Sequence, residues 1–178
     1  MPETDEDLML RLARRDDDAA LIELMNRYRT LLVNHFAKRG VQQEYEDLAQ
    51  ETFFRIYKAR KRYKVTASFR TWMFHIAQRV WIDHVRKSSR RQRRESAYRE
   101  EPRPRHVSPK GMLSHDLRWA LGRLSPRHRD VVVFSTLEQL PHKEIADILG
   151  IPEGTVKSRL HHALRELRTH LEQEDPLT

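Results

Sequence analysis

The side chains whose chemistry is easiest to interpret lie between positions 153 and 165. This stretch carries hydroxyl, imidazole and cationic groups, on Thr155, Lys157, Ser158, Arg159, His161, His162 and Arg165. Hydroxyl groups near a helix N-terminus bind phosphate oxygens together with free backbone N–H groups. Lysine and arginine displace counterions from a polyanion, and arginine also binds the edge of guanine. These residue types therefore predict contact with nucleic acid.

The residues just before this stretch predict the element that would present it. A helix-turn-helix needs a small residue where its two helices cross, and Ala146 meets that need. Its turn needs a residue that tolerates positive φ, which Gly150 supplies. The shared core would consist of Ile145, Leu149, Ile151, Val156 and Leu160. We predict a helix-turn-helix whose second helix presents polar residues to the major groove, with an ordinary helical hairpin as the alternative.

Helical patterns cover most of the remaining chain. Apolar residues recur at helical spacing over 5–15, 17–38, 43–62 and 68–90, and again over 113–123 and 126–137. Ser68 and Ser125 suit N-caps, and Pro126 suits the first helical position. Residues 95–112 contain three prolines and few apolar residues, which is typical of a linker. We predict an all-α fold of two small helical domains, 1–94 and 113–178, joined by a flexible linker.

Basic and aromatic residues lie close together in the first domain. Residues 55–64 hold six basic residues and no acidic one, and residues 84–94 form a second basic cluster. Aromatic rings beside such clusters are typical of proteins that bind single-stranded nucleic acid, because bases stack on the rings. Most of the rings also fit an apolar helical stripe, so core packing is the alternative. We expect Tyr63 and Trp72 to be the exceptions that lie outside the core.

One face of the predicted helix 43–62 is polar and acidic, with Asp47, Gln50, Glu51 and Phe54. Negative charge is unsuited to contact with DNA. The face is therefore either solvated or a docking surface for another protein, and the spacing leaves both interpretations open.

The composition limits the classes of function. Basic residues number 34 against 26 acidic ones, a formal charge of +8, which favours a polyanionic partner, nucleic acid before membrane. The chain has no cysteine, which excludes disulfides, thiolate metal sites and cysteine catalysis and fits a reducing compartment. No apolar run approaches the roughly 20 residues that span a bilayer. The N-terminus is acidic, unlike that of a signal peptide. We expect a cytoplasmic protein without membrane insertion.

Catalytic and cofactor sites find no support in the motifs. No glycine belongs to a phosphate-binding loop, and no histidine pair has metal-ligand spacing with a carboxylate partner. We therefore expect no enzyme activity, no cofactor and no metal, and we set a metal-dependent nuclease aside.

Three stretches resemble the bacterial sigma factors of the extracytoplasmic-function (ECF) group of the sigma-70 family. They are residues 46–53 (EDLAQETF), residues 69–73 (FRTWM) and residues 144–160, which contain EIA and GTVKSRL. They occur in the family's order, with a linker between the second and the third, and the resemblance covers about residues 8–94 and 113–172.

The resemblance implies a factor that binds core RNA polymerase and directs promoter-specific initiation of transcription without making or breaking a bond itself. The first domain would be region 2. Its acidic face would dock on the clamp helices of the β′ subunit through Asp47, Leu48, Gln50 and Glu51. The loop 62–68 and the helix after it would capture a flipped −10 base and hold the melted strand through Tyr63, Phe69, Arg70, Trp72, Arg79, Asp83, Arg86 and Arg90.

The second domain would be region 4, whose recognition helix reads the −35 element through the polar residues of 155–165 named above. The polymerase β subunit and an anti-sigma factor are the further partners that the family implies. The region that separates these two domains in primary sigma factors is missing, which favours the ECF group over a housekeeping factor.

The sequence departs from the family pattern at positions that would contact DNA. Arg79 stands where the family often has an asparagine near the −10 base. His161-His162-Ala163 replaces the usual arginine pairing, and Leu164 stands where a second arginine is common. The alternative function is a stand-alone helix-turn-helix regulator, which would dimerise and bind duplex DNA tightly without polymerase.

Overall fold

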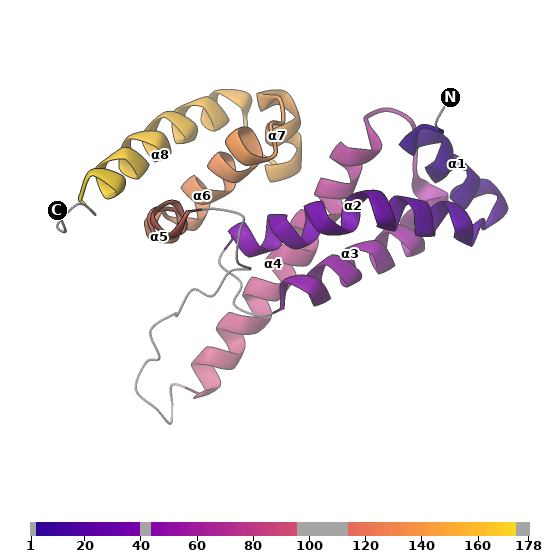
Figure 1. The fold of residues 1–178 in the computed structure, drawn as a ribbon, viewed down its shortest axis with the longest axis horizontal. Helices are drawn as coiled ribbons and strands as arrows, with labels where there is room; N and C mark the ends of the chain where they lie inside the picture. The colour runs from indigo at the N-terminus through magenta and orange to yellow at the C-terminus, as the bar shows by residue number, and fades with distance from the viewer. Residues whose placement is uncertain (1–2, 40–43, 96–113, 174–178) are drawn as a thin grey trace. The chain divides into compact units, whose positions relative to one another are not determined.

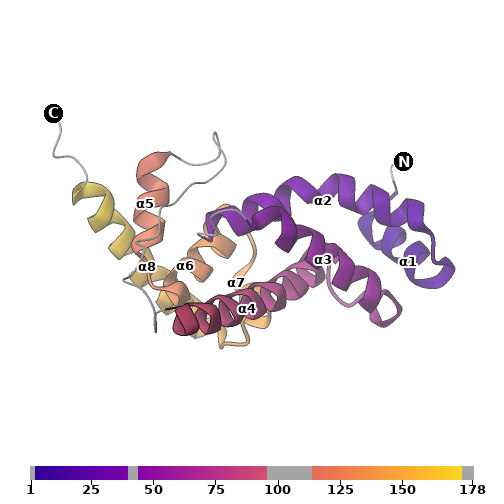
Figure 2. The same ribbon diagram turned by 90° about the horizontal axis from the view of Figure 1, so that it is seen from below.

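The computed structural model describes residues 3–39, 44–95 and 114–173. Within these ranges the regular structure is entirely helical, which confirms the predicted all-α fold. The helices are shown in Figures 1 and 2. Their bounds are α1 (Asp5–Arg15), α2 (Asp18–Lys38), α3 (Tyr45–Ala59), η1 (Arg60–Arg62), α4 (Phe69–Glu95), α5 (His115–Arg123), α6 (Pro126–Val132), η2 (Val133–Leu137), α7 (His142–Leu149) and α8 (Glu153–Gln173).

The described residues form two units by their contacts. The first unit contains residues 3–33 and 44–95, and the second contains residues 34–39 and 114–173. Residues 34–39, which the predicted boundaries assign to the first domain, group with the second unit by their contacts. The predicted linker 95–112 lies outside the described residues except for its first position. The domain boundaries themselves stay a prediction.

The predicted helix starts have the local chemistry that the sequence indicates. Ser125 caps α6, since its hydroxyl accepts from the His128 N–H, and Pro126 occupies the first turn. The Ser68 hydroxyl accepts from the Thr71 N–H at the start of α4, over 3.1 Å. A second acceptor comes from α1, because the Phe69 N–H donates to the Glu6 carboxylate over 2.8 Å. Negative charge at this helix N-terminus also interacts favourably with the helix dipole.

The first unit is built around the packing of α3 along α4. Phe53 and Ile56 of α3 and Phe74 and Ala77 of α4 are buried in its core. Arg55 adds a polar link at the rim, donating to Glu51 of its own helix and to Asp83 of α4 over 2.7 and 2.8 Å. This packing and this ion pair therefore fix the position of the acidic face of α3 relative to the outer face of α4.

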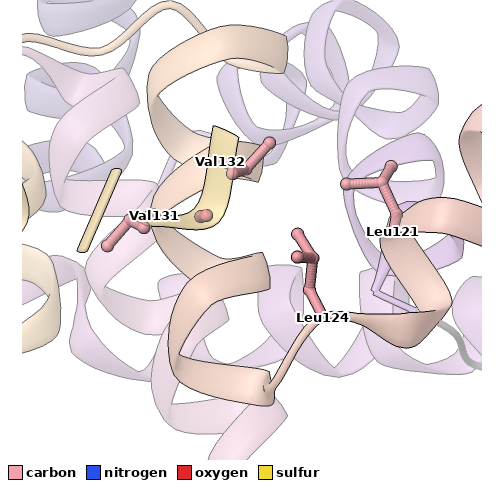
Figure 3. Packing of buried hydrophobic residues seen from close by; sticks show 5 residues of the cluster. Leu121, Leu124, Val131 and Val132 are labelled. Atoms are coloured by element: carbon pink, nitrogen blue, oxygen red, sulfur yellow. The ribbon is translucent and has the colours of Figure 1, made fainter. Parts of the chain in front are cut away.

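The second unit has a small apolar core that α5, α6 and α8 share. Figure 3 shows Leu121 and Leu124 with Val131 and Val132 of α6, and Ala163 of α8 completes the buried cluster. The Arg129 guanidinium donates to the carbonyls of Leu121, Gly122 and Leu124 where α5 ends, and the Leu121 carbonyl also accepts from the Leu124 N–H. This side chain thereby fixes the end of α5 against α6.

The predicted helix 126–137 is not a continuous α-helix. The α-helical part ends at Val132, and residues 133–137 form the π-helical turn η2. The extra residue of a π turn rotates the side chains that follow it, and such turns are frequent at functional sites. Periodicity alone does not reveal the turn, because its first two residues, Val133 and Phe134, are buried and apolar and continue the helical pattern.

Among the described helices, none is long and apolar enough to cross a membrane.

Candidate nucleic-acid and protein interfaces

Helices α7 and α8 form the predicted helix-turn-helix. The first of them ends at Gly150, whose φ of 64° is the left-handed value that the sequence analysis anticipated. The Ile151 N–H donates to the Ala146 carbonyl over 3.1 Å, which closes the helix end. The new helix then starts after Pro152, whose carbonyl accepts from the Thr155 and Val156 N–H groups. The turn therefore sets the position of the first residues of α8.

Helix α8 has a buried and an exposed side. Val156 and Ala163 are fully buried, and Leu160 and Leu167 pack against the core of the second unit. Of the seven residues predicted to contact −35 DNA, five are exposed and two are half-buried. The exposed ones are Lys157, Ser158, His161, His162 and Arg165, and the half-buried ones are Thr155 and Arg159. The helix thus presents most of the predicted reading face to solvent.

The N-terminal turn of α8 combines a charge pair with open space. The Lys157 ammonium lies 2.9 Å from the Glu153 carboxylate, and this hydrogen bond lowers the pKa of Glu153. Apart from its two chain neighbours and the backbone of its own helix, no atom lies within 4 Å of a Cβ added at Gly154. One turn further on, the rings of His161 and His162 lie edge to face at 5.7 Å. The space beside Gly154 in this first turn is therefore open.

The residues predicted to hold the −10 strand fall into two groups. Arg79, Arg86 and Arg90 are exposed on α4, and Arg70, Trp72 and Asp83 are half-buried. Tyr63 and Phe69 are instead 6% and 0% exposed.

The expectation that Tyr63 lies outside the core is wrong. Its ring packs edge to face against Trp72 at 5.0 Å, and burial raises the pKa of Tyr63 to about 12. The ring is buried because α1 packs against η1, at whose end Tyr63 lies, with the Tyr63 N–H donating to the Arg60 carbonyl. Tyr63 thus packs against Trp72, and Trp72 is the ring of the two that retains accessible surface.

The predicted polymerase-docking residues are also divided by burial. Asp47 and Gln50 are exposed and Glu51 is half-buried, but Leu48 is only 8% exposed and belongs to the core. Beside them, Phe54 is 51% exposed, with the Lys58 ammonium 4.3 Å from the centre of its ring. The sequence predicts Phe54 on this face but indicates no role for it. Its position outside the apolar stripe of the helix is the sequence feature that could have indicated an exposed aromatic contact.

Asp83 has a protein partner that the spacing does not show. Its carboxylate accepts from Arg55, and this hydrogen bond lowers the pKa of Asp83. Arg55 was not among the predicted site residues, although its position four residues after Glu51 suits an ion pair on one helix face. Three of the described histidines each lie within 3.5 Å of one acidic side chain: His35 of Glu138, His84 of Glu44 and His128 of Glu166. Within the described ranges, no group of three possible metal ligands lies close enough together to hold an ion.

Comparisons with known proteins match both units. The family model described as sigma-70 region 2 matches residues 24–91, and the model described as sigma-70, region 4 matches residues 120–169. The chain is 33% identical over 165 residues to the ECF RNA polymerase sigma factor SigL of Mycobacterium tuberculosis, covering 88% of this chain and 92% of that one. It is also 33% identical over 138 residues to the ECF RNA polymerase sigma factor SigE of Mycolicibacterium smegmatis, covering 74% of this chain and about half, 53%, of that relative.

A solved structure has a similar fold. The sigma factor RpoE of Bartonella quintana, crystallised in complex with the anti-sigma factor NepR, matches with a TM-score of 0.73 at 21% identity. The match covers 85% of this chain and 96% of that one.

Proposed function

The chain belongs to the extracytoplasmic-function group of the sigma-70 family, and we propose that as a sigma factor it directs RNA polymerase to promoters through separate surfaces on its two units. The observation that carries the proposal is the exposed polar side of α8 behind a helix-turn-helix turn with Gly150 at positive φ. The function follows from family membership, and the exposure of individual side chains supports the roles proposed for them below.

The second unit reads the −35 element through α8. Ser158, His161 and Arg165 occur at spacings of three and four, so they share one exposed helix face and are the candidates for base contacts. Thr155 and the free N–H groups of the first turn bind phosphate, with Lys157 beside them. Lys157 leaves its partner Glu153 when it binds DNA, which reduces its net contribution to affinity. Arg159 and His162 lie at the edge of this face.

The first unit holds the melted −10 strand on α4. Arg79, Arg86 and Arg90 supply exposed positive charge along one helix, and Trp72 supplies the accessible ring on which a base can stack. Phe69 and Tyr63 act only by supporting Trp72, because both are buried. Asp83 orients Arg55 and contributes no attraction for DNA.

The acidic face of α3 docks on core RNA polymerase. Asp47, Gln50 and Glu51 meet a basic partner surface, in agreement with the β′ clamp helices that the family implies. Phe54 adds the apolar anchor that such a face needs, since exposed aromatic rings supply much of the binding energy of protein interfaces. The β subunit is the expected neighbour of the second unit.

Regulation and location follow from the same membership. The factor makes and breaks no bond and acts in the cytoplasm, where RNA polymerase transcribes the chromosome. A binding partner of the anti-sigma class controls it, as the complex of the Bartonella quintana protein with NepR illustrates for a chain of similar fold.

The test is run-off transcription with core RNA polymerase on genomic fragments, followed by mapping of the start sites. We expect RNA from a defined set of promoters only when the chain is present. The variant Arg165→Ala should weaken initiation at these promoters, whereas Arg123→Ala, an exposed arginine of α5, should not. A lack of promoter-dependent RNA on every template, together with tight duplex binding by the chain alone, would favour a stand-alone regulator and overturn the proposal.

A further inference from the structure

A buried carboxylate lies immediately before the helix-turn-helix. Glu138 follows η2 and is 3% exposed, although it is a glutamate in a segment that leads to the surface helix α7. The Lys38 ammonium and His35 Nδ1 lie 3.3 and 3.4 Å from its Oε1 atom. The partners are about a hundred positions away in the sequence, His35 being 103 residues before Glu138.

The backbone around Glu138 makes the connection to α7. The Glu138 N–H donates to the Val133 carbonyl over 2.9 Å, and the Leu140 N–H donates to the Phe134 carbonyl over 3.0 Å. Between them, Gln139 has a φ of 54°, a left-handed conformation that residues with a side chain rarely adopt. Pro141 then caps α7. The chain reverses here in a conformation that the surrounding contacts must hold in place.

A second buried ion pair accompanies the first. The Arg39 guanidinium is fully buried, lies 2.8 Å from the Asp130 carboxylate of α6 and faces the Phe134 ring. The Arg39 carbonyl in turn accepts from Arg129 over 3.0 Å. Residues 35–39 thus contact Asp130 of α6 and Glu138, the residue after η2, through ionic groups.

Buried ion pairs are a weak source of stability, because the desolvation of both charges offsets their attraction. An apolar contact of the same size would stabilise the unit equally well. What a buried pair supplies instead is a defined geometry, since any shift leaves a charge unpaired in an apolar environment. The position of this pair, one residue before the strained Gln139, suggests what that geometry is for.

We propose that Glu138 is a positioning residue for the helix-turn-helix. Its pairing with Lys38 and His35 fixes the turn 138–141, and the turn fixes the direction in which α7 begins. Because α7 packs against α8, the orientation of the reading face depends on residues 35–39 of α2. The DNA-binding consequence rests on the proposed function, whereas the local ordering of α7 does not.

Amide hydrogen exchange of the full chain tests the local ordering without any ligand. In Glu138→Gln, we expect the amides of residues 140–150 to exchange about tenfold faster or more, the scale of a lost buried charge-assisted hydrogen bond. The amides of α5 and of the middle of α8 should change much less. The matched control Glu172→Gln, an exposed glutamate of α8, should leave all of them unchanged. Unchanged exchange over 140–150, or an equal increase throughout the second unit, would overturn the proposal.

A second variant keeps the test decisive if Glu138→Gln fails to fold. Lys38 is 13% exposed, so Lys38→Met removes the cation at a position that tolerates a long apolar chain. It should loosen the same residues. In the double variant Glu138→Gln, Lys38→Met, the loss of protection should be smaller than the sum of the losses in the two single variants, because each substitution removes the same ion pair. Strictly additive losses would show that Glu138 and Lys38 do not act through their mutual contact.

The DNA arm uses the duplex −35 region of a promoter mapped with the wild-type holoenzyme. Well below its unfolding temperature, Glu138→Gln should bind this duplex about tenfold more weakly, and Glu172→Gln should bind it as wild type does. Equal affinity for Glu138→Gln and wild type, with faster exchange over 140–150, would overturn the link to the reading face. If the wild-type chain directs no transcription, the proposed function fails while the exchange measurement still decides the role of Glu138.

Discussion

His35 is held in an environment that opposes its ordinary protonation. The side chain is fully buried, with the rings of Phe36 and Phe134 at 5.5 and 5.1 Å. Burial lowers the pKa of His35 to about 4, and the hydrogen bond to Glu138 opposes this shift only in part. Burial by itself would raise the pKa of Glu138, but His35 and Lys38 bring it below its ordinary value. The folded second unit therefore holds a neutral imidazole next to a carboxylate.

This environment makes the stability of the second unit dependent on pH. An unfolded chain binds the histidine proton near pH 6.5, whereas the folded one resists it down to about pH 4. The resulting stability is complete above pH 6.5 and is lost as the pH falls from 6.5 toward 4. We expect the free energy of unfolding to fall by about 2 kcal/mol between pH 7.5 and 5. Urea unfolding followed by tryptophan fluorescence measures this free energy. The chain for this measurement carries Trp72→Phe and Trp81→Phe, so that the signal comes from Trp119 in the second unit.

The control for this pH effect is His35→Gln in the same tryptophan background. It removes the titrating group, so most of the difference between pH 7.5 and 5 should disappear. An equally large pH dependence in this variant would assign the effect to another group.

The reading face contains two histidines where protonation has the opposite consequence. His161 and His162 are exposed on the reading face, so a positive charge on either ring would add to the attraction for DNA. We expect the affinity for a −35 duplex to rise about threefold to tenfold when the pH is lowered from 8 to 6 at constant salt. Fluorescence anisotropy of a labelled duplex measures it. The double variant His161→Gln, His162→Gln should be nearly flat, and a wild-type affinity that does not change with pH would contradict the assignment.

At the scale of the elements, the helix-turn-helix has two glycines that differ in conformation. Gly150 has a φ of 64° at the end of α7, whereas Gly154 lies in the first turn of α8 with open space around it. Only the first of them needs the freedom of glycine. The second costs the helix stability without relieving any contact inside the protein.

The two alanine variants should therefore shift stability in opposite directions. Gly150→Ala should lower the free energy of unfolding by about 1 kcal/mol or more, because it forces a side chain into the left-handed region. Gly154→Ala should raise it by up to about 1 kcal/mol. Thermal unfolding monitored by circular dichroism compares the two. A loss of stability in Gly154→Ala would mean that its first turn is more constrained than the open space indicates.

At the scale of the whole molecule, each unit carries its own candidate DNA surface. The exposed arginines of α4 belong to one unit and the exposed side of α8 to the other. The chain as a whole carries a formal charge of +8, which favours non-specific attraction to DNA at low salt. Specific initiation requires both surfaces together with the polymerase. Substitutions in the first unit and in the second unit should therefore impair different steps of initiation.

Holoenzyme formed with variant chains tests this division. Arg79→Ala should reduce strand opening, measured as the permanganate reactivity of unpaired thymines near −10, and leave binding of a −35 duplex unchanged. Arg165→Ala should weaken duplex binding first and opening only as a consequence. Loss of both activities in either variant, with unchanged stability, would argue that one continuous surface performs both steps.

The sequence by itself determined the parts of this protein whose causes are local. Helical spacing, the Ser125-Pro126 start and the Gly150 turn each depend on residues within a few positions of one another, and the structure has all three. The two-sided character of α8 follows in the same way, because burial of Val156 and Ala163 exposes the opposite side.

Only the tertiary structure decided which of the predicted site residues reach solvent and which distant residues meet. Tyr63 and Leu48 have suitable chemistry, but they are buried because neighbouring helices cover the positions at which they lie. Arg55 meets Asp83, and Lys38 meets Glu138, across separations that no spacing rule encodes. Contacts of this kind depend on how whole helices pack, since packing is set by the combined burial of many side chains and not by any single pattern.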